Sequence, residues 1–240
     1  TERVEEELEL LMPEIRIGRL DLDSTKGKYG FDKIITAFDE HEFDVLIGTQ
    51  MVAKGLDFGR VSLIGVINAD TIINFPDFRS YERAFSLFSQ VAGRAGRREA
   101  GGRVIIQSYT TKHRVLEQVV NNDYEDMFMT EITERKNYLY PPFYRLIRID
   151  IKHADFQKCY DSANRFAVAL RQQLGARVLG PEPPLVSRVR NNFIQTITLK
   201  IERTNISIAK VKELIRSVLL DFEIDKSNTG VRVQVDVDPY

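Results

Sequence analysis

The hydrophobic pattern of this 240-residue chain changes at Pro141-Pro142, and this change limits the folds open to it. Before the two prolines, short apolar segments alternate with segments whose apolar residues recur at helical spacing. After them, three segments alternate apolar and polar residues, as half-buried strands do, with amphipathic helices between them. Consecutive prolines favour a turn. The pattern therefore predicts two domains of different fold class, with a boundary near residue 140.

The first part of the chain has the pattern of an α/β domain. Apolar segments at 15–20, 45–48, 61–67 and 103–108 are predicted strands, and 2–12, 31–39 and 80–91 are predicted helices. Strands and helices that alternate at this length favour a parallel sheet with flanking helices. The run Val61–Ile67 is almost continuously apolar, which is typical of a strand covered on both faces. Ligands of such sheets usually bind beyond the carboxyl ends of the strands.

The rest of the chain divides into a connector and a second domain. Residues 113–138 are predicted to be helical, with a break near Asn121-Asn122. Strands at 146–151, 194–201 and 231–237 alternate with helices at 156–174 and 206–222, whereas Gly180–Pro184 has the pattern of a proline-rich turn. This order is typical of a small α+β domain of ferredoxin-like type. We expect domains at 1–110 and 141–240, joined by a helical connector at 111–140.

Composition excludes several classes of protein. Hydrophobic residues make up 43% and charged residues 29%, as in soluble globular proteins, and no apolar run is long enough to cross a membrane. The start, Thr-Glu-Arg, lacks a secretory signal and an initiator Met, so we expect a cytoplasmic protein and a piece of a longer or processed chain. Cys159 is the only cysteine, which excludes an internal disulfide and a cysteine-based zinc site within the chain. The three histidines have no metal-ligand spacing, so no metal site is expected.

The net charge of −1 conceals an uneven distribution. Residues 1–110 carry 14 basic and 18 acidic groups, whereas residues 141–240 carry 16 and 11. A basic segment suits an acidic partner such as nucleic acid, although an excess of this size equally fits a solvated surface.

One stretch, Gln90-Val-Ala-Gly-Arg-Ala-Gly-Arg97, carries the clearest chemical pattern. Arg94 and Arg97 are three residues apart, so one helical turn places both guanidinium groups on the same face. The adjacent glycines allow a ligand to approach the backbone closely. Two fixed cations suit a polyphosphate, and a solvated basic helix end is the alternative.

A second stretch lies upstream, where the strand at 45–47 runs into Gly48-Thr49-Gln50 and then Lys54-Gly55-Leu-Asp57. Together the two stretches resemble the fifth and sixth motifs of superfamily 2 helicases, which belong to the second of two RecA-like motor lobes. The segments Thr1–Leu8, Asp77–Arg83 and Val235–Pro239 extend the resemblance to the PriA family of replication-restart helicases, also called primosomal protein N′. A translocase of the RecG or transcription-repair type is the nearest competitor, and the Asp-Val-Asp-Pro ending and the Asp-Phe-Arg stretch argue against it.

The resemblance implies the second motor lobe and C-terminal domain of an ATP-dependent 3′-to-5′ DNA helicase that restarts stalled forks by primosome assembly. It also implies roles for individual residues. Arg97 is the expected arginine finger and Arg94 its support, Gln90 links the nucleotide site to the moving parts, Gly55 and Asp57 meet the nucleotide, and Thr49 and Gln50 contact the DNA backbone. Taken alone, Asp57 is typical of a helix cap or a solvated carboxylate, and Thr49 is typical of a turn.

The sequence lacks the Gly-x-x-x-x-Gly-Lys-Ser/Thr loop and an Asp-Glu-x-His motif. The resemblance therefore places the main binding residues for the ATP phosphates and Mg²⁺ in a first motor lobe outside this chain. That lobe is an expected partner. We predict that the isolated chain does not hydrolyse ATP. The family carries a cysteine-rich zinc module before this region, so zinc is expected in the parent protein only.

Other arginines have less specific patterns. Arg79 and Arg83 are candidates for contacts that couple the ATP and DNA sites, and an ion pair with Asp77 or Glu82 is the alternative. Arg188 and Arg190, near Phe193, suit DNA binding by charge and stacking, and a solvated loop with Phe193 packed into the core is the alternative. The implied partners are forked or single-stranded DNA, other primosome proteins and single-stranded DNA-binding protein, with no membrane. An adapter that binds DNA or protein and has lost the motor is the competing function.

Overall fold

The computed structural model describes residues 1–21, 30–49, 61–93, 102–204 and 206–239. The chain divides into two compact units, Thr1–Phe128 and Met129–Tyr240, each described by itself below. The division lies inside helix α7 (Tyr124–Asn137), within the segment predicted to be a connector. The domain limits at 110 and 140 stay predictions.

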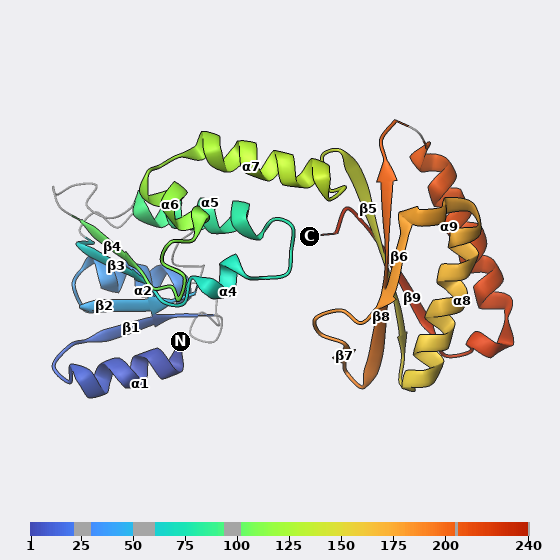
Figure 1. Cartoon of the computed structure of the whole chain (residues 1–240). Coiled ribbons are helices and arrows are strands. Elements are labelled where there is room, and N and C mark those ends of the chain that lie inside the picture. The colour runs from blue at the N-terminus through green and yellow to red at the C-terminus, as the bar shows by residue number, and fades with distance from the viewer. Residues whose placement is uncertain (22–29, 50–60, 94–101, 205, 240) are drawn as a thin grey trace. The chain divides into compact units, whose positions relative to one another are not determined.

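The described residues of the first unit form two pairs of parallel strands (Figure 1). Strand β1 (Ile17–Leu20) pairs with β2 (Val45–Gly48), and β3 (Leu63–Val66) pairs with β4 (Arg103–Ile106). Parallel neighbours need a crossover connection. Helix α2 (Gly30–Asp39) lies between β1 and β2 in the chain, and α4 (Asp70–Ile73) and α5 (Ser80–Ala92) lie between β3 and β4. Helix α1 (Glu2–Leu11) precedes them. Because both strand pairs are parallel and have helices in their crossovers, the predicted α/β class with parallel strands is confirmed.

In its described part, two small apolar clusters stabilise this unit. Leu20, which is fully buried, packs against residues of α2 such as Phe31 and Phe38. The second, called the α5 cluster below, joins α5 to α6 (Arg114–Val120) and includes Phe88, which is also fully buried.

Strand β3 differs from its prediction. Val66 and Ile106 pack against the α5 cluster, whereas Leu63 and Ile105 on the opposite face are 56% and 59% exposed. The expectation that this strand is covered on both faces is therefore wrong, because the helices that pack on β3 and β4 cover one face.

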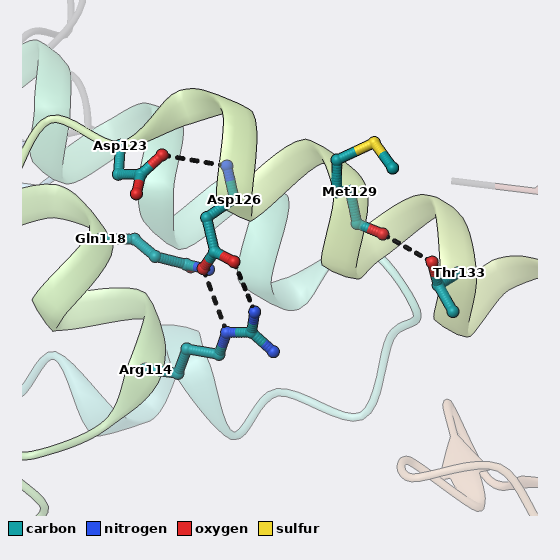
Figure 2. A network of polar contacts seen from close by, with 6 residues as sticks. All are labelled: Arg114, Gln118, Asp123, Asp126, Met129 and Thr133. Atoms are coloured by element: carbon teal, nitrogen blue, oxygen red, sulfur yellow. Dashed lines mark hydrogen bonds and ion pairs between the residues drawn. The ribbon is translucent and has the colours of Figure 1, made fainter.

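A polar network ties α6 to α7 (Figure 2). The Asp126 carboxylate accepts hydrogen bonds from Arg114 Nη2 and Gln118 Nε2, both at 2.6 Å, and the Asp126 amide donates to Asp123 Oδ1 at 2.9 Å. The hydrogen bonds from Arg114, and then from Gln118, lower the pKa of Asp126. The predicted break near Asn121-Asn122 is confirmed: the two helices end and begin around it, and Asn122 has φ of 53°. Within α7, Thr133 Oγ1 donates to the Met129 carbonyl (Figure 2).

The second unit is an antiparallel sheet with two helices on one face (Figure 1). Its strand order is β6-β8-β5-β9, and a short strand β7 also pairs with β8. The bounds are β5 Tyr144–His153, β6 Val178–Glu182, β7 Arg188–Val189, β8 Asn192–Glu202 and β9 Arg232–Val237. Helices α8 (Phe156–Leu174) and α9 (Ile208–Ile224) each end in a short 3₁₀ turn, at Gly175–Arg177 and Lys226–Asn228.

The core of this unit is one continuous cluster. Alternate residues of β5 and β8, including Ile147, Ile149 and Ile197, are fully buried and pack with Phe166 of α8 and Val211 of α9. This alternation is what the sequence pattern predicted for half-buried strands.

The segment Gly180–Pro184 corrects another prediction, because Gly180 and Pro181 lie within strand β6 rather than in a turn. β6 lies at the edge of the described sheet, where a proline without an N–H is tolerated. The register shifts between Leu179 and Glu182, and Gly180 has φ of +83°. Residues typical of a turn are therefore accommodated in this irregular edge strand, which is why the sequence predicted a turn.

Candidate functional site

Helix α5 positions the end of the first unit that leads into the arginine motif. Its buried residues Ala84, Phe85 and Phe88 belong to the α5 cluster and fix one face of the helix. Gln90 lies on the exposed face in the last turn. The helix ends at Ala92, and the Gly93 amide donates to the Ser89 carbonyl at 2.9 Å. Arg94 and Arg97 follow directly and lie outside the described residues.

Thr49 is exposed just beyond the carboxyl end of β2. Gly48 pairs with Leu20, the last residue of β1, so Thr49 lies at the carboxyl edge of a parallel pair. This is the edge at which ligands of parallel sheets bind. Gln50, Gly55 and Asp57, the other predicted residues of this stretch, lie outside the described residues.

The carboxyl edge of β3 and β4 is closed by a carboxylate that the sequence analysis did not single out. Asp70 accepts hydrogen bonds from Ser108 Oγ at 3.0 Å and from the Tyr109 amide at 2.9 Å. These bonds, above all the one from the Tyr109 backbone, lower the pKa of Asp70. The signal in the sequence is a polar residue shortly after each strand, which is visible only once the two strands are known to be neighbours.

Arg79 and Arg83 lie around Asp77. Arg83 Nη1 forms an ion pair with Asp77 Oδ2 at 2.9 Å, and the Arg79 amide donates to Asp77 Oδ1 at 2.9 Å. The Arg79 guanidinium lies 5.3 Å from the centre of the Phe78 ring. For Arg83, the alternative of an ion pair with Asp77 is therefore confirmed.

In the second unit, Arg188 and Arg190 belong to a β-hairpin rather than a loop (Figure 1). Arg188 pairs with Phe193 and Val189 with Asn192, which leaves Arg190 and Asn191 as the two turn residues. Both have positive φ, 46° and 63°, as the tightest hairpin turns require. Arg188 and Arg190 are exposed, and the Arg188 guanidinium lies over the Phe193 ring, 4.8 Å from its centre. Phe193 is partly buried against the core, so the hairpin holds both arginines at the surface.

The described residues show neither a membrane-spanning helix nor a cluster of metal ligands. None of the helices that the structure describes is both long and apolar enough to pass through a membrane. In the same residues, histidine, cysteine and carboxylate side chains do not gather in groups of three that suit a metal ion.

Two family models match the chain in succession. The helicase conserved C-terminal domain matches residues 1–99, and the primosomal protein N C-terminal domain matches residues 136–240. The first match covers the residues of both helicase-like motifs, and the second covers the basic hairpin.

Curated relatives match along the same length. The replication restart protein PriA of Bacillus subtilis is 37% identical over 242 residues, which cover all of this chain and 30% of the relative. The protein of the same name from Treponema pallidum is 38% identical over all of this chain and 36% of the relative, and that from Synechocystis is 34% identical over 94% and 28%. The chain thus spans about a third of the length of the curated relatives it matches. With a helicase C-terminal domain followed by the C-terminal domain of primosomal protein N, the chain belongs to the PriA family of replication restart proteins.

Proposed function

We propose that this chain supplies the second motor lobe and the C-terminal domain of an ATP-dependent 3′-to-5′ DNA helicase that restarts stalled replication forks. One observation carries the proposal: a helicase domain and a primosomal domain follow one another in a single chain, and Gln90 of the helicase motif lies exposed at the end of α5. The names of the relatives, replication restart protein, support the same process. The cytoplasm is the proposed location.

Two finer assignments of fold belong to this proposal. The parallel pairs β1–β2 and β3–β4, with helices in the crossovers, support a RecA-like lobe for the first unit. The second unit has the element order β5-α8-β6-β8-α9-β9, apart from the short β7, and this order supports a ferredoxin-like domain.

ATP and Mg²⁺ are the proposed cofactors, shared with the first motor lobe of the parent protein. Arg97 and Arg94 supply fixed positive charge to the phosphates, which stabilises the charge that develops during phosphoryl transfer. Gly55 and Asp57 meet the nucleotide, and Gln90 couples it to the motor. Zinc is proposed for the parent only. Because the chain lacks the phosphate-cradling loop, it is inactive as an ATPase on its own.

DNA is the proposed substrate. Thr49 and Gln50 contact the strand on which the motor moves, and Arg188 and Arg190 hold DNA phosphates at the surface of the second unit. The exposure of Thr49, Arg188 and Arg190 supports these roles. Other primosome proteins and single-stranded DNA-binding protein are the proposed protein partners.

The test is DNA-stimulated ATP hydrolysis by the parent protein with Arg97→Ala. We expect turnover to fall by roughly three orders of magnitude, because an arginine finger acts on the transition state, while ATP affinity largely persists. Arg103→Ala, at an exposed position of β4, is the matched control and should leave turnover unchanged. Unchanged turnover in Arg97→Ala would instead show that the arginine motif is structural, and would favour an adapter role for this part of the parent protein.

A further inference from the structure

Two aromatic side chains of α8 are exposed at the end of the helix next to the hairpin. Phe156 is 50% exposed and Tyr160 is 44% exposed, and they lie one helical turn apart. Their ring centroids are 6.3 Å apart and their planes differ by 18°. Two nearly parallel rings therefore face solvent on one side of the helix.

These rings are held in place by the core and by the hairpin. The Phe156 ring meets Phe193 edge to face, with centroids 5.5 Å apart and planes at 78°. Phe193 packs against the apolar core of the unit and carries the Arg188 guanidinium on its ring. We use the term basic–aromatic surface for Phe156, Tyr160, Arg188 and Arg190. Its aromatic part needs no rearrangement to be presented, because Phe193 fixes both the ring of Phe156 and the charge of Arg188.

The charges around this surface favour an anionic ligand. Neither Arg188 nor Arg190 forms an ion pair with any described residue, and both side chains are exposed. The nearby carboxylates are engaged within their own helix: Asp155 accepts from the Lys158 amide, and Asp161 accepts from Gln157 Nε2.

We propose that the basic–aromatic surface binds the unpaired bases of single-stranded DNA. Bases stack on Phe156 and Tyr160, while Arg188 and Arg190 contact the phosphates of the same strand. Each base has a π face, so stacking of this kind is tolerant of sequence. In a duplex the base faces are hidden by their neighbours, so the rings distinguish single strands from duplex. This inference rests on the proposed function, because it names the form of DNA that the second unit engages.

The test measures the binding of the full chain to a fluorescent oligo-dT and to a blunt duplex of equal length, over a range of salt concentrations. The double variant Phe156→Leu/Tyr160→Leu keeps apolar side chains but removes the rings. We expect its affinity for oligo-dT to fall on the order of tenfold, with little change for the duplex and an unchanged salt slope. Tyr160→Phe retains the ring and should bind normally. Val168→Ala, at a 53% exposed position of the same helix, is the matched control.

A second variant, Arg188→Ala/Arg190→Ala, separates this inference from the proposed function. Removing two phosphate contacts should reduce the salt slope on single strands by about 1.4. A reduced slope together with normal binding by the ring variant overturns base stacking and leaves phosphate binding in place. An unchanged slope removes the arginines from the proposed DNA site, whatever the ring variant does. Equal losses on oligo-dT and duplex in the ring variant overturn the preference for unpaired bases. Thermal unfolding of each variant verifies that the fold is intact.

Discussion

The two units of this chain differ in how they are stabilised. The second unit has one continuous apolar cluster, built from both central strands and both long helices. The described part of the first unit has two separate clusters, one around Leu20 and one around α5. Both units add polar contacts between elements, such as the Arg114–Asp126 network between α6 and α7 in the first (Figure 2) and the Arg177–Glu202 ion pair at 2.7 Å in the second, so the contrast lies in their apolar cores.

This difference corresponds to a difference in where the candidate residues lie. An antiparallel sheet needs cover on one face only, so two helices complete the core of the second unit and its surface residues sit on a rigid frame. In the first unit, Thr49 lies after β2 and Gln90 lies in the last turn of α5. In the second unit, Phe156 and Arg188 also lie near element ends, but both contact the Phe193 ring, which packs against the core. Residues that change their contacts are suited to element ends, whereas a stacking surface is suited to side chains that a core holds in place.

The largest effect is expected from cavities in the two main clusters. Phe166 in the second unit is 1% exposed and meets Phe222 edge to face at 5.2 Å, and Phe88 in the first unit is fully buried. Each Phe→Ala substitution should reduce the free energy of unfolding by about 3–5 kcal/mol, because it removes apolar contacts and leaves a cavity. Every member of each cluster comes from one unit. In calorimetry we therefore expect Phe166→Ala to lower the unfolding temperature of the second unit and Phe88→Ala that of the first.

Val168→Ala, at an exposed position of α8, serves as the control for Phe166→Ala. If either core variant lowered the unfolding temperatures of both units, the units would not fold independently, and the contrast between them would be wrong.

A smaller effect is expected at the edge of the second sheet. A Cβ atom at Gly180 would lie 2.6 Å from the Thr196 carbonyl oxygen, and φ is +83°. Gly175 also has positive φ, +58°, but a Cβ there would meet no atom within 4 Å. Gly180→Ala should therefore reduce the free energy of unfolding more than Gly175→Ala does. For Gly175→Ala, backbone strain alone predicts a loss of about 1–3 kcal/mol.

Urea unfolding of both variants, followed by circular dichroism, measures the difference. Equal losses in the two variants would mean that β6 moves away from β8 at little cost. The edge of the second unit would then be less rigid than its centre.

Much of the fold was predictable from the sequence, because local periodicity determines it. The strand at 45–48 and the helix at 156–174 match β2 and α8 to the residue, and the break near Asn121-Asn122 is where α6 and α7 separate. Strand β6 was missed because Gly180 and Pro181 are turn residues by composition, and only pairing with β8 makes them part of a sheet.

The candidate sites were predictable in part. Arg188 and Arg190 were identified from their charge near Phe193, but the hairpin that aligns Arg188 with Phe193 follows from strand pairing. Phe156 and Tyr160 were assigned to an amphipathic helix, because helical spacing alone does not distinguish an exposed ring from a buried one. Asp70 was missed because Ser108 and Tyr109, its partners, lie nearly forty residues away in the chain.

The smallest effect is expected from an exposed ion pair in the first unit. Asp44, just before β2, accepts hydrogen bonds from the Arg16 amide at 2.9 Å and from Arg16 Nε at 3.0 Å, which joins the starts of β1 and β2. The Arg16 side chain, followed by its backbone, lowers the pKa of Asp44 to about 2. A lowered pKa in the folded state means that the stabilisation is present above about pH 4 and is lost as the pH falls towards 2.

Asp44→Asn should therefore slightly lower the unfolding temperature of the first unit at pH 6. It should also make that temperature less sensitive to acid between pH 4 and 2. The effect is small because both side chains are about half exposed, at 57% and 44%, and water screens the pair. Asp39→Asn, at an exposed position at the end of α2, is the control. Calorimetry at pH 6, 4 and 2 measures the change. If Asp44→Asn also lowered the unfolding temperature of the second unit, this polar contact of the first unit would stabilise both units. The contrast between the units would then hold only for their apolar cores.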